Sequence, residues 1–511
     1  MSDIAANNKR IAKNTILLYL RMLLMMVISL YTSRVILNAL GVDDYGIYNV
    51  VGGVVAMFSI LSGTLSAAVS RFITFALGKG DLDSMKKVFS TSVNVQILLA
   101  IIIAVLLETI GIWFLNTKMV IPENRLFAAN IVFQISIVSF AINLWSIPYN
   151  ATIIAHEKMS AFAYISIFES IAKLFIAFIV SYCITDKLIV YAILILLVGL
   201  IVRLIYGHYC KKHFQECSYT FVIDKPLLKE IFVFSGWNFI GASSAVLRDQ
   251  GSNLLVNVFF GPGVNAARGI ATQVSGTVSS FVNNFMVAVN PQITKSYASK
   301  DWDYMMSLIS KSARFSYYIL LILAVPLIMC IDYILEIWLG IVPDHTANFV
   351  RLILVFTLSE CLANPLITAM LANGNIRNYQ IVVGGCQLFN IPISYILLKW
   401  GYAVEAVFIV NIIVSIVADF VRVYMLRTMI SFSAGKFIKS VFLNVAVVTV
   451  MAFAIPIIAY IYFPRGLLYT LLTGIISLVS VGLSIWVFGL HTSERNMLLN
   501  KLTTAIAKTK K

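Results

Sequence analysis

Charge is scarce in this sequence. Asp, Glu, Lys and Arg make up 12% of the 511 residues, whereas 60% are hydrophobic and the mean hydropathy is +0.91. A soluble globular chain carries about 25% charged residues, so this composition excludes a soluble domain and predicts an all-α polytopic membrane protein. The formal net charge of +15 does not indicate nucleic-acid binding, because Lys and Arg concentrate in short loops on one side of a membrane.

Motifs for chemistry are missing as well. The sequence has no Walker loop, no Ser/His/Asp arrangement and no Cys-x-x-Cys among its six cysteines. His208, Cys210, His213 and Cys217 lie close together in the sequence, but their spacing matches no zinc site. No loop on the predicted outer side is long enough to fold as a domain. We therefore expect neither an enzyme nor a metal or other bound cofactor.

About fourteen stretches are long and apolar enough to span a membrane, since a span needs about 20 apolar residues. In order they are 14–37, 47–70, 88–115, 126–153, 161–182, 188–209, 230–259, 264–289, 315–339, 349–371, 380–398, 403–426, 437–463 and 467–488. The first six predict an amino-terminal lobe (1–210) and the next six a carboxy-terminal lobe (230–430). A cytoplasmic linker (211–229) joins the lobes, and two extra helices (431–490) and a basic tail (491–511) follow.

The basic residues favour one orientation in the membrane. If the amino terminus is cytoplasmic, the cytoplasmic segments hold most of the Lys and Arg of the loops. The opposite loops then hold little beyond Lys118, Arg125, Lys187, Lys399 and Arg465. Such a bias sets the orientation of membrane proteins, and an odd number of spans would destroy it. We therefore predict that both termini are cytoplasmic.

The two predicted lobes share an internal repeat. Identical residues recur 220 positions apart without a gap: Gly41, Val54, Ser59, Ala68, Val69, Ile73, Thr74, Asp81, Asp83, Met85 and Ser90 match Gly261, Val274, Ser279, Ala288, Val289, Ile293, Thr294, Asp301, Asp303, Met305 and Ser310. Internal repeats are typical of transporters. Because six spans separate the copies, both copies have the same orientation and are related by an axis along the membrane normal.

Two arginines lie in the spans on either side of the turn Phe260-Gly261-Pro262-Gly263. A charged side chain at membrane depth costs about 2.5–3.5 kcal/mol and normally faces a wet cavity or a partner. Arg248 lies midway along its span, where its alternative is a local pairing with Asp249. Adjacent helical residues point about 100° apart, so we expect them to face each other poorly. Arg268 lies in the first turn of the next helix, whose positive end also favours anions.

Two further arginines lie in the first predicted span. Arg21 lies nearer the predicted cytoplasmic end, where its side chain could extend to the interface or face a cavity. Arg34 lies nearer the outer end and breaks the charge bias, so it needs a partner. Asp43 and Asp44, in the following loop, are structural candidates for that partner. Arg21, Arg34, Arg248 and Arg268 are our candidate ligands of an anionic substrate.

Three acidic residues are candidates for a cavity or for binding a coupling ion. Glu108 and Glu360 have no basic partner nearby in the sequence, and Asp249 follows Arg248. Each could carry a coupling proton or sodium ion. Other acids have a basic residue three or four positions away, and we interpret them as self-neutralising helical pairs: Glu169–Lys173 and Asp419–Arg422.

Three short motifs within this arrangement resemble a known superfamily. They are Gly41-Val42-Asp43-Asp44-Tyr45-Gly46, Pro148-Tyr149-Asn150 and Arg268-Gly269-Ile270-Ala271. With two six-helix lobes, they resemble the MOP (multidrug/oligosaccharidyl-lipid/polysaccharide) superfamily. Within it, the chain is similar to polysaccharide flippases of the Wzx type, which serve O-antigen and capsule synthesis.

The resemblance implies a function in the bacterial inner membrane. Flippases of this type move an undecaprenyl-diphosphate-linked oligosaccharide from the inner to the outer leaflet by alternating access. It implies a cavity lined mainly by 14–37, 47–70, 230–259 and 264–289, where arginines bind the diphosphate. The expected partners are this lipid-linked substrate, membrane lipid and, as a candidate, the glycan polymerase machinery. We expect a monomer.

Three other functions stay open. A multidrug exporter of the same superfamily would carry cations and need carboxylates in its cavity, yet 14–37, 47–70 and 264–289 contain no Asp or Glu. A peptidoglycan lipid II flippase would use the same phosphate chemistry with a different sugar. A membrane-embedded glycan polymerase or ligase would need a large external loop, which this sequence lacks.

Overall fold

The computed structural model describes residues 2–56, 59–117, 121–220, 224–260, 262–339, 342–430, 432–464, 466–492 and 494–496. Contacts divide the chain into two compact units. Unit 1 comprises 1–242, 287–301 and 374–377, and unit 2 comprises 243–286, 302–373 and 378–511. We describe each unit by itself.

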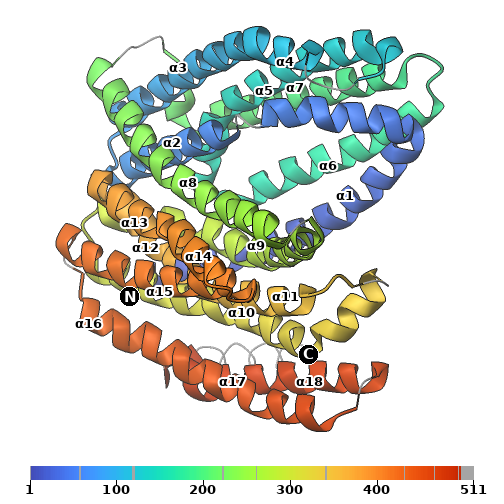
Figure 1. The fold of residues 1–511 in the computed structure, drawn as a ribbon. Helices are drawn as coiled ribbons and strands as arrows, with labels where there is room; N and C mark the ends of the chain where they lie inside the picture. Colours follow the sequence, from blue (N-terminus) through green and yellow to red (C-terminus); the bar gives the residue numbers. More distant parts are fainter. Residues whose placement is uncertain are drawn as a thin grey trace, which may run out of the picture. The chain divides into compact units, whose positions relative to one another are not determined.

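The described chain is helical from end to end (Figure 1). Its first half contains α1 (Ser2–Ala56), α2 (Ser59–Lys79), α3 (Leu82–Leu106), η1 (Leu107–Gly111), α4 (Ile112–Thr117), η2 (Glu123–Arg125), α5 (Leu126–Ala155), α6 (Met159–Tyr182), α7 (Lys187–His213) and η3 (Gln215–Cys217). The second half contains α8 (Lys225–Phe260), α9 (Pro262–Ala298), α10 (Trp302–Leu339), α11 (Thr346–Cys361), α12 (Ala363–Asn373), α13 (Arg377–Leu388), α14 (Asn390–Lys399) and α15 (Glu405–Met429). It ends with α16 (Ala434–Phe437), η4 (Ile438–Phe442), α17 (Leu443–Tyr462), α18 (Leu467–Ser484) and η5 (Ile485–Gly489).

Twelve helical stretches of the described chain are long and apolar enough to cross a membrane. The sequence predicted about fourteen. The two that fall short are α2 and α9, which the sequence placed in spans at 47–70 and 264–289. Both form helices of sufficient length, 21 and 37 residues. In α9, serines, threonines and amides interrupt the apolar run. The all-α membrane fold is therefore confirmed.

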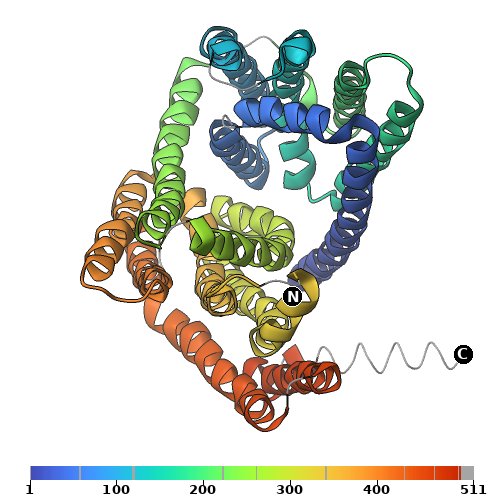
Figure 2. The same cartoon turned by 45° about the vertical axis from the view of Figure 1, so that its right-hand side comes forward.

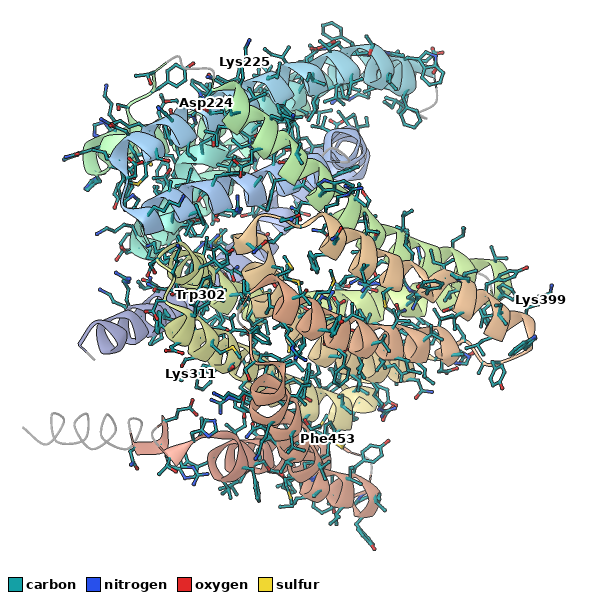
Figure 3. The ribbon with its side chains drawn as sticks, turned by 90° about the vertical axis from the view of Figure 1, so that its left-hand side faces the viewer. Asp224, Lys225, Trp302, Lys311, Lys399 and Phe453 are labelled. Carbon is teal, nitrogen blue, oxygen red and sulfur yellow. The ribbon has the colours of Figure 1, made fainter. Side chains whose placement is uncertain are left out.

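The repeat extends to the boundaries of the helices. Leu82 begins α3 and Trp302 begins α10, 220 residues later. Leu126 begins α5 and Thr346 begins α11, with the same offset. Asp81 caps α3 by accepting hydrogen bonds from the backbone of Asp83 and Ser84. The repeated sequence thus specifies a repeated set of helices. Figure 3 labels Trp302 at the start of α10 and Lys225 at the start of α8.

The first repeated helix breaks at a glycine. Gly41 has φ 79° and ψ 171° and interrupts α1, whose halves would otherwise form one helix. A positive φ of this kind is costly for residues with a Cβ. The corresponding Gly261 lies outside the described residues, between the end of α8 and the start of α9. A glycine break therefore divides α1 at the position that separates α8 from α9.

In unit 1, α6 packs against α1 and α7, and α5 packs against α2, α3 and α7.

One arginine joins three segments of unit 1. Arg125 donates to Asp44 on α1 through Nε (2.7 Å) and to Asp186 through Nη1 (2.7 Å). Burial opposes ionisation of Asp186, but its hydrogen bonds with Arg125 and the start of α7 together lower its pKa. Asp44, expected as a candidate partner of Arg34, thus binds Arg125.

A second ionic cluster in unit 1 centres on Glu157, whose side chain is fully buried. Its carboxylate binds Arg10 Nε and Lys295 Nζ, both at 2.7 Å, and accepts from Gln292 at 2.7 and 2.8 Å. Its backbone carbonyl accepts from Asn14. The cluster therefore joins α1 and the α5–α6 turn of the first repeat to the carboxyl end of α9 from the second.

In unit 2, the added hairpin α17–α18 packs against α10 (Figure 2, red against yellow). Arg314 on α10 is buried, and its guanidinium binds Glu494 at 2.7 Å and the carbonyl of Gly489 at 2.9 Å. Tyr318, one turn further along α10, donates to Asn444 and to the same carbonyl. Buried polar bonds thus hold the extra helices against the repeated ones.

Candidate substrate-binding cavities

Unit 1 contains an elongated cavity of about 360 Å³. Its walls come from four helices, which contribute Arg21 and Met25 (α1); Ser139, Ile142, Asn143, Ser146, Ile147 and Asn150 (α5); Phe162, Ser166, Glu169 and Lys173 (α6); and Ile195, Gly199, Val202 and Tyr206 (α7). The walls combine hydroxyls, amides and charges. Such a lining suits a polar molecule.

The cavity follows one face of each of the helices α5, α6 and α7. The α6 members occupy positions i, i+4, i+7 and i+11, and the α7 members repeat this spacing. Residues at such intervals share one side of an α-helix. Ser139, Asn143, Ser146 and Asn150 form the same pattern on α5. Eleven residues at about 1.5 Å each extend over roughly 16 Å of helix, so the cavity is a groove along the helices.

Arg21 lies on the wall of this groove with incomplete hydrogen bonding. Its guanidinium carbon lies 4.2 Å from the centroid of the Phe162 ring, a cation–π contact. Its Nε is buried and has no hydrogen-bond partner among the described residues. The Oδ1 of Asn150, which also lines the groove, is likewise buried and has no hydrogen-bond partner among the described residues. Buried polar atoms are normally satisfied, so an arginine donor and an amide acceptor are available here to a ligand.

The other two charges of the groove form a pair. Lys173 Nζ donates to Glu169 Oε1 at 2.6 Å, and both side chains are partly exposed. This confirms the predicted helical pair, although nothing in its spacing indicated that it lines a cavity. The described side chains of the groove thus comprise two cations and one carboxylate, a net charge of +1.

Unit 2 has a cavity of about 260 Å³ with the opposite balance. Its lining is Arg248 and Asp249 (α8); Ser275, Ser279, Val282 and Asn283 (α9); Leu320 (α10); Phe356, Thr357, Glu360 and Cys361 (α11); and Asn364 (α12). One cation and two carboxylates give these described side chains a net charge of −1.

Both carboxylates of this cavity bind its arginine. Arg248 is 5% exposed, and its Nη1 lies 2.8 Å from Glu360 Oε1. Its Nε lies 3.1 Å from Asp249 Oδ1, so our expectation that adjacent residues face each other poorly was wrong. The long arginine side chain bends back along the helix to reach its neighbour. Arg268 donates to the backbone carbonyl of Asp249 at 2.9 Å. The predicted arginines of unit 2 are therefore already engaged.

Two predicted candidates lie apart from these cavities or cannot be placed. Glu108, in η1, is exposed and accepts a hydrogen bond from Gln134 at 3.0 Å. It lines neither cavity described above. Arg34 lies on α1, but its side chain is outside the described residues. Within the described ranges, no three His, Cys, Asp or Glu side chains are grouped to hold a metal ion.

Sequence reasoning missed several groups beside or on the groove. Arg203 on α7 is 5% exposed, and its guanidinium carbon lies 4.1 Å from the Trp145 ring and 3.8 Å from the Tyr149 ring. Asn150 was noted in a motif but not as a site residue. The polar residues at helical spacing on α5 were a sufficient pattern to find this face. In this groove α5, α6 and α7 accompany α1, and no described side chain of α2 contributes.

The chain matches a family model over more than half of its length. A family model described as "Polysaccharide biosynthesis protein" matches residues 11–297, which include the whole lining of the unit 1 groove. The uncharacterized membrane protein EpsK of Bacillus subtilis (strain 168) is 20% identical over 320 residues, covering 62% of this chain. The chain spans 63% of the length of that relative.

Solved structures share the fold at low sequence identity. A MATE protein in the bent conformation aligns with a TM-score of 0.72 and 14% identity, covering 85% of this chain and 97% of its own. An outward-facing multidrug resistance MATE family transporter of the MOP superfamily aligns with a TM-score of 0.71 and 15% identity. The alignment covers 83% of this chain and 96% of that transporter. A MOP superfamily transporter from Pyrococcus furiosus Vc1 (DSM3638), described as having a binding pocket of reverse polarity, gives 0.71 and 14% with the same coverage.

These matches identify the class of protein. The family match covers more than half of the chain, and the structural matches give a MATE-like fold. The resemblance to the MOP superfamily noted in the sequence is therefore confirmed. The chain belongs to the polysaccharide biosynthesis protein family, and it is a multi-pass membrane protein with the MATE-like fold of the MOP superfamily structures.

Proposed function

We propose that this transporter moves an undecaprenyl-diphosphate-linked oligosaccharide from the inner to the outer leaflet of the bacterial inner membrane, for O-antigen, capsule or exopolysaccharide synthesis. Membership of the family implies a lipid-linked substrate in general terms. The observation that carries the proposal is Arg21, whose buried Nε has no hydrogen-bond partner among the described residues and whose groove has a lining of net positive charge. A guanidinium group binds phosphate oxygens in bidentate fashion.

The groove suits a polar head that must cross a membrane. Hydroxyl and amide side chains along α5 can exchange hydrogen bonds with sugar hydroxyls while Arg21 binds the diphosphate. The prenyl tail stays in lipid, because burying its hydrocarbon in a polar groove gains nothing. Transport breaks no covalent bond, so binding and release are the only chemistry that the residues supply.

We place both termini in the cytoplasm and propose that the lobes 1–210 and 230–430 rock against each other, as in other transporters built from repeats. An inside-negative potential favours outward movement of the diphosphate by about 2.3 kcal/mol per charge per 100 mV. A coupling ion could add to this, and Glu360 and Asp249 are the groups available to bind a proton or sodium ion in unit 2.

A second function, cation export, is favoured by the unit 2 cavity. Asp249 and Glu360 outnumber Arg248 there, and carboxylates in a cavity suit a cationic substrate. We rank it second because both carboxylates already bind Arg248. A peptidoglycan lipid II flippase would use Arg21 in the same way and would differ in the sugar.

The proposal is tested on the lipid intermediates of a strain that lacks this chain. We expect undecaprenyl-diphosphate-linked oligosaccharide to accumulate on the cytoplasmic leaflet while the matching surface glycan disappears. Complementation with Arg21→Gln should fail, whereas Arg427→Gln, which removes an exposed arginine at the end of α15, should succeed. Normal surface glycan with raised sensitivity to cationic dyes would favour export of cations instead.

A further inference from the structure

The unit 1 groove contains a second cation beyond Arg21. Phe162, on which Arg21 stacks, and Lys173 lie eleven residues apart on the same face of α6. Glu169, which holds the lysine ammonium, lies seven residues beyond Phe162, or about 10 Å along the helix. The groove therefore has two cationic positions, one at each end of this face.

The chemistry of a diphosphate gives this spacing a meaning. A diphosphate carries more negative charge than one guanidinium neutralises, and it is too short to bridge two helical turns. It would therefore contact the two cations in succession as it moves along α6. A path through a membrane works when each site binds well enough to admit the ligand and weakly enough to release it.

The pair with Glu169 is suited to such a temporary role. The lysine and glutamate side chains are 43% and 35% exposed, so the pair opens onto the cavity and is not sealed in the core. The lysine ammonium has three donors on a flexible stem. It can turn from the carboxylate to a phosphate without moving the helix.

We propose that Lys173 is a second phosphate-binding residue of the groove. Glu169 binds the lysine when no ligand is present and competes with the diphosphate for it. The inference rests on the proposed function, since it concerns the same groove and the same class of ligand. The lysine receives the diphosphate after Arg21, and the carboxylate limits how tightly the lysine retains it. The alternative is an ordinary helical pair that only stabilises α6.

The experiment measures binding of farnesyl diphosphate to the purified full-length protein in lipid nanodiscs. Glu169→Gln frees the lysine and should tighten binding by about three- to tenfold, whereas Lys173→Gln should weaken it by about tenfold. The matched controls are Glu123→Gln and Lys87→Gln, which make the same charge changes at exposed sites outside the groove. Both controls should bind like the wild type.

The sign of the effects separates the two roles of the pair. A purely structural pair predicts that both substitutions act alike, so effects of equal sign, or none, would overturn the proposal. The exchanged variant Glu169→Lys/Lys173→Glu keeps a pair but moves the cation by one turn. A structural role predicts wild-type binding and transport in that variant, and we expect neither. Thermal unfolding of each variant checks that the fold is intact.

Arg21→Gln distinguishes failure of this inference from failure of the proposed function. If Arg21→Gln loses binding while Glu169→Gln and Lys173→Gln match the wild type, only the second phosphate site is wrong. If Arg21→Gln also binds like the wild type, the groove is not the diphosphate site and both proposals fail.

Discussion

The two cavities lie in different copies of the repeat and have opposite charge. In unit 1, the Nε donor of Arg21 has no hydrogen-bond partner among the described residues, and Glu169, the one carboxylate of the described lining, binds Lys173. In unit 2, Arg248 binds Glu360 and Asp249, and no surplus positive charge is left among the described lining residues. We therefore expect the first arrangement to bind an anion directly, whereas in the second an anion must displace a carboxylate.

The charged residues of the two cavities do not correspond in the repeat. The residues 220 positions before Arg248, Asp249 and Glu360 are Ile28, Ser29 and Phe140. The residue 220 positions after Arg21 is Gly241. The repeat therefore preserved helix boundaries while each copy placed its charges independently.

The largest expected effect tests what holds unit 1 together. Glu157→Gln leaves Lys295 and Arg10 facing an amide in a buried site. Breaking a buried ion pair by removing one partner costs about 3–5 kcal/mol, so the midpoint of thermal unfolding should fall clearly. The control Glu123→Gln removes an exposed carboxylate and should change it little. An unchanged midpoint for Glu157→Gln would show that the cluster contributes nothing to unit 1.

The next effect tests the contrast between the two arginines. Arg21→Gln removes charge-assisted hydrogen bonds worth about 1.5–3 kcal/mol, so farnesyl diphosphate binding should weaken by about ten- to a hundredfold. Arg21→Lys keeps the charge but loses the bidentate geometry and should be intermediate. The double variant Arg248→Gln/Glu360→Gln removes one charge of each sign and should bind like the wild type. If the double variant lost as much affinity for farnesyl diphosphate as Arg21→Gln, the two cavities would not differ in phosphate binding.

A third experiment converts unit 2 to the charge of unit 1. Asp249→Asn with Glu360→Gln removes both partners of Arg248 and changes the described lining charge from −1 to +1. We expect the number of farnesyl diphosphate molecules bound per protein to rise from one to two. Glu360→Gln alone brings the lining to neutral and should leave one. A single site in the double variant would mean that charge does not decide where the phosphate binds.

The smallest effect concerns pH and the loops of unit 1. Because the folded-state pKa of Asp186 is lowered, its stabilising contribution is present above its ordinary pKa of about 3.9 and is lost as the pH falls through the folded value. Asp186→Asn keeps a capping side chain for α7 and should cost at most about 1 kcal/mol near neutral pH, because partly exposed pairs are worth little. Wild type and variant should converge in acid. A constant difference in unfolding midpoint across that range would contradict the pairing with Arg125.

The sequence predicted the framework more fully than the site, for a physical reason. Apolar stretches and a gap-free repeat follow from local composition, so the helices and their paired boundaries could be foreseen. The bond from Arg248 to Glu360 joins residues 112 positions apart, and the partners of Glu157 are further away still. Such contacts depend on which helices pack together, and hydropathy does not contain that information.

The groove could have been found in part. The polar residues of α5 recur at helical spacing, and Phe162, Ser166, Glu169 and Lys173 share one face of α6. The spacing of Glu169 and Lys173 predicted only a pair that cancels its own charge. Candidate arginines were chosen mainly by their depth in a predicted span. A position deep in a predicted span identifies a buried cation, but it does not tell whether that cation binds a carboxylate of the protein or a ligand. Only the structure separates Arg21 from Arg248 on that ground.

The most direct test of the central claim measures transport itself. The purified protein is reconstituted in liposomes, and the movement of a short-chain prenyl-diphosphate-linked sugar between leaflets is timed for the wild type, Arg21→Gln and Arg427→Gln. We predict that Arg21→Gln slows the movement by at least about tenfold and that Arg427→Gln leaves it unchanged. Wild-type movement by Arg21→Gln would contradict the assignment of the unit 1 groove as the site of the diphosphate.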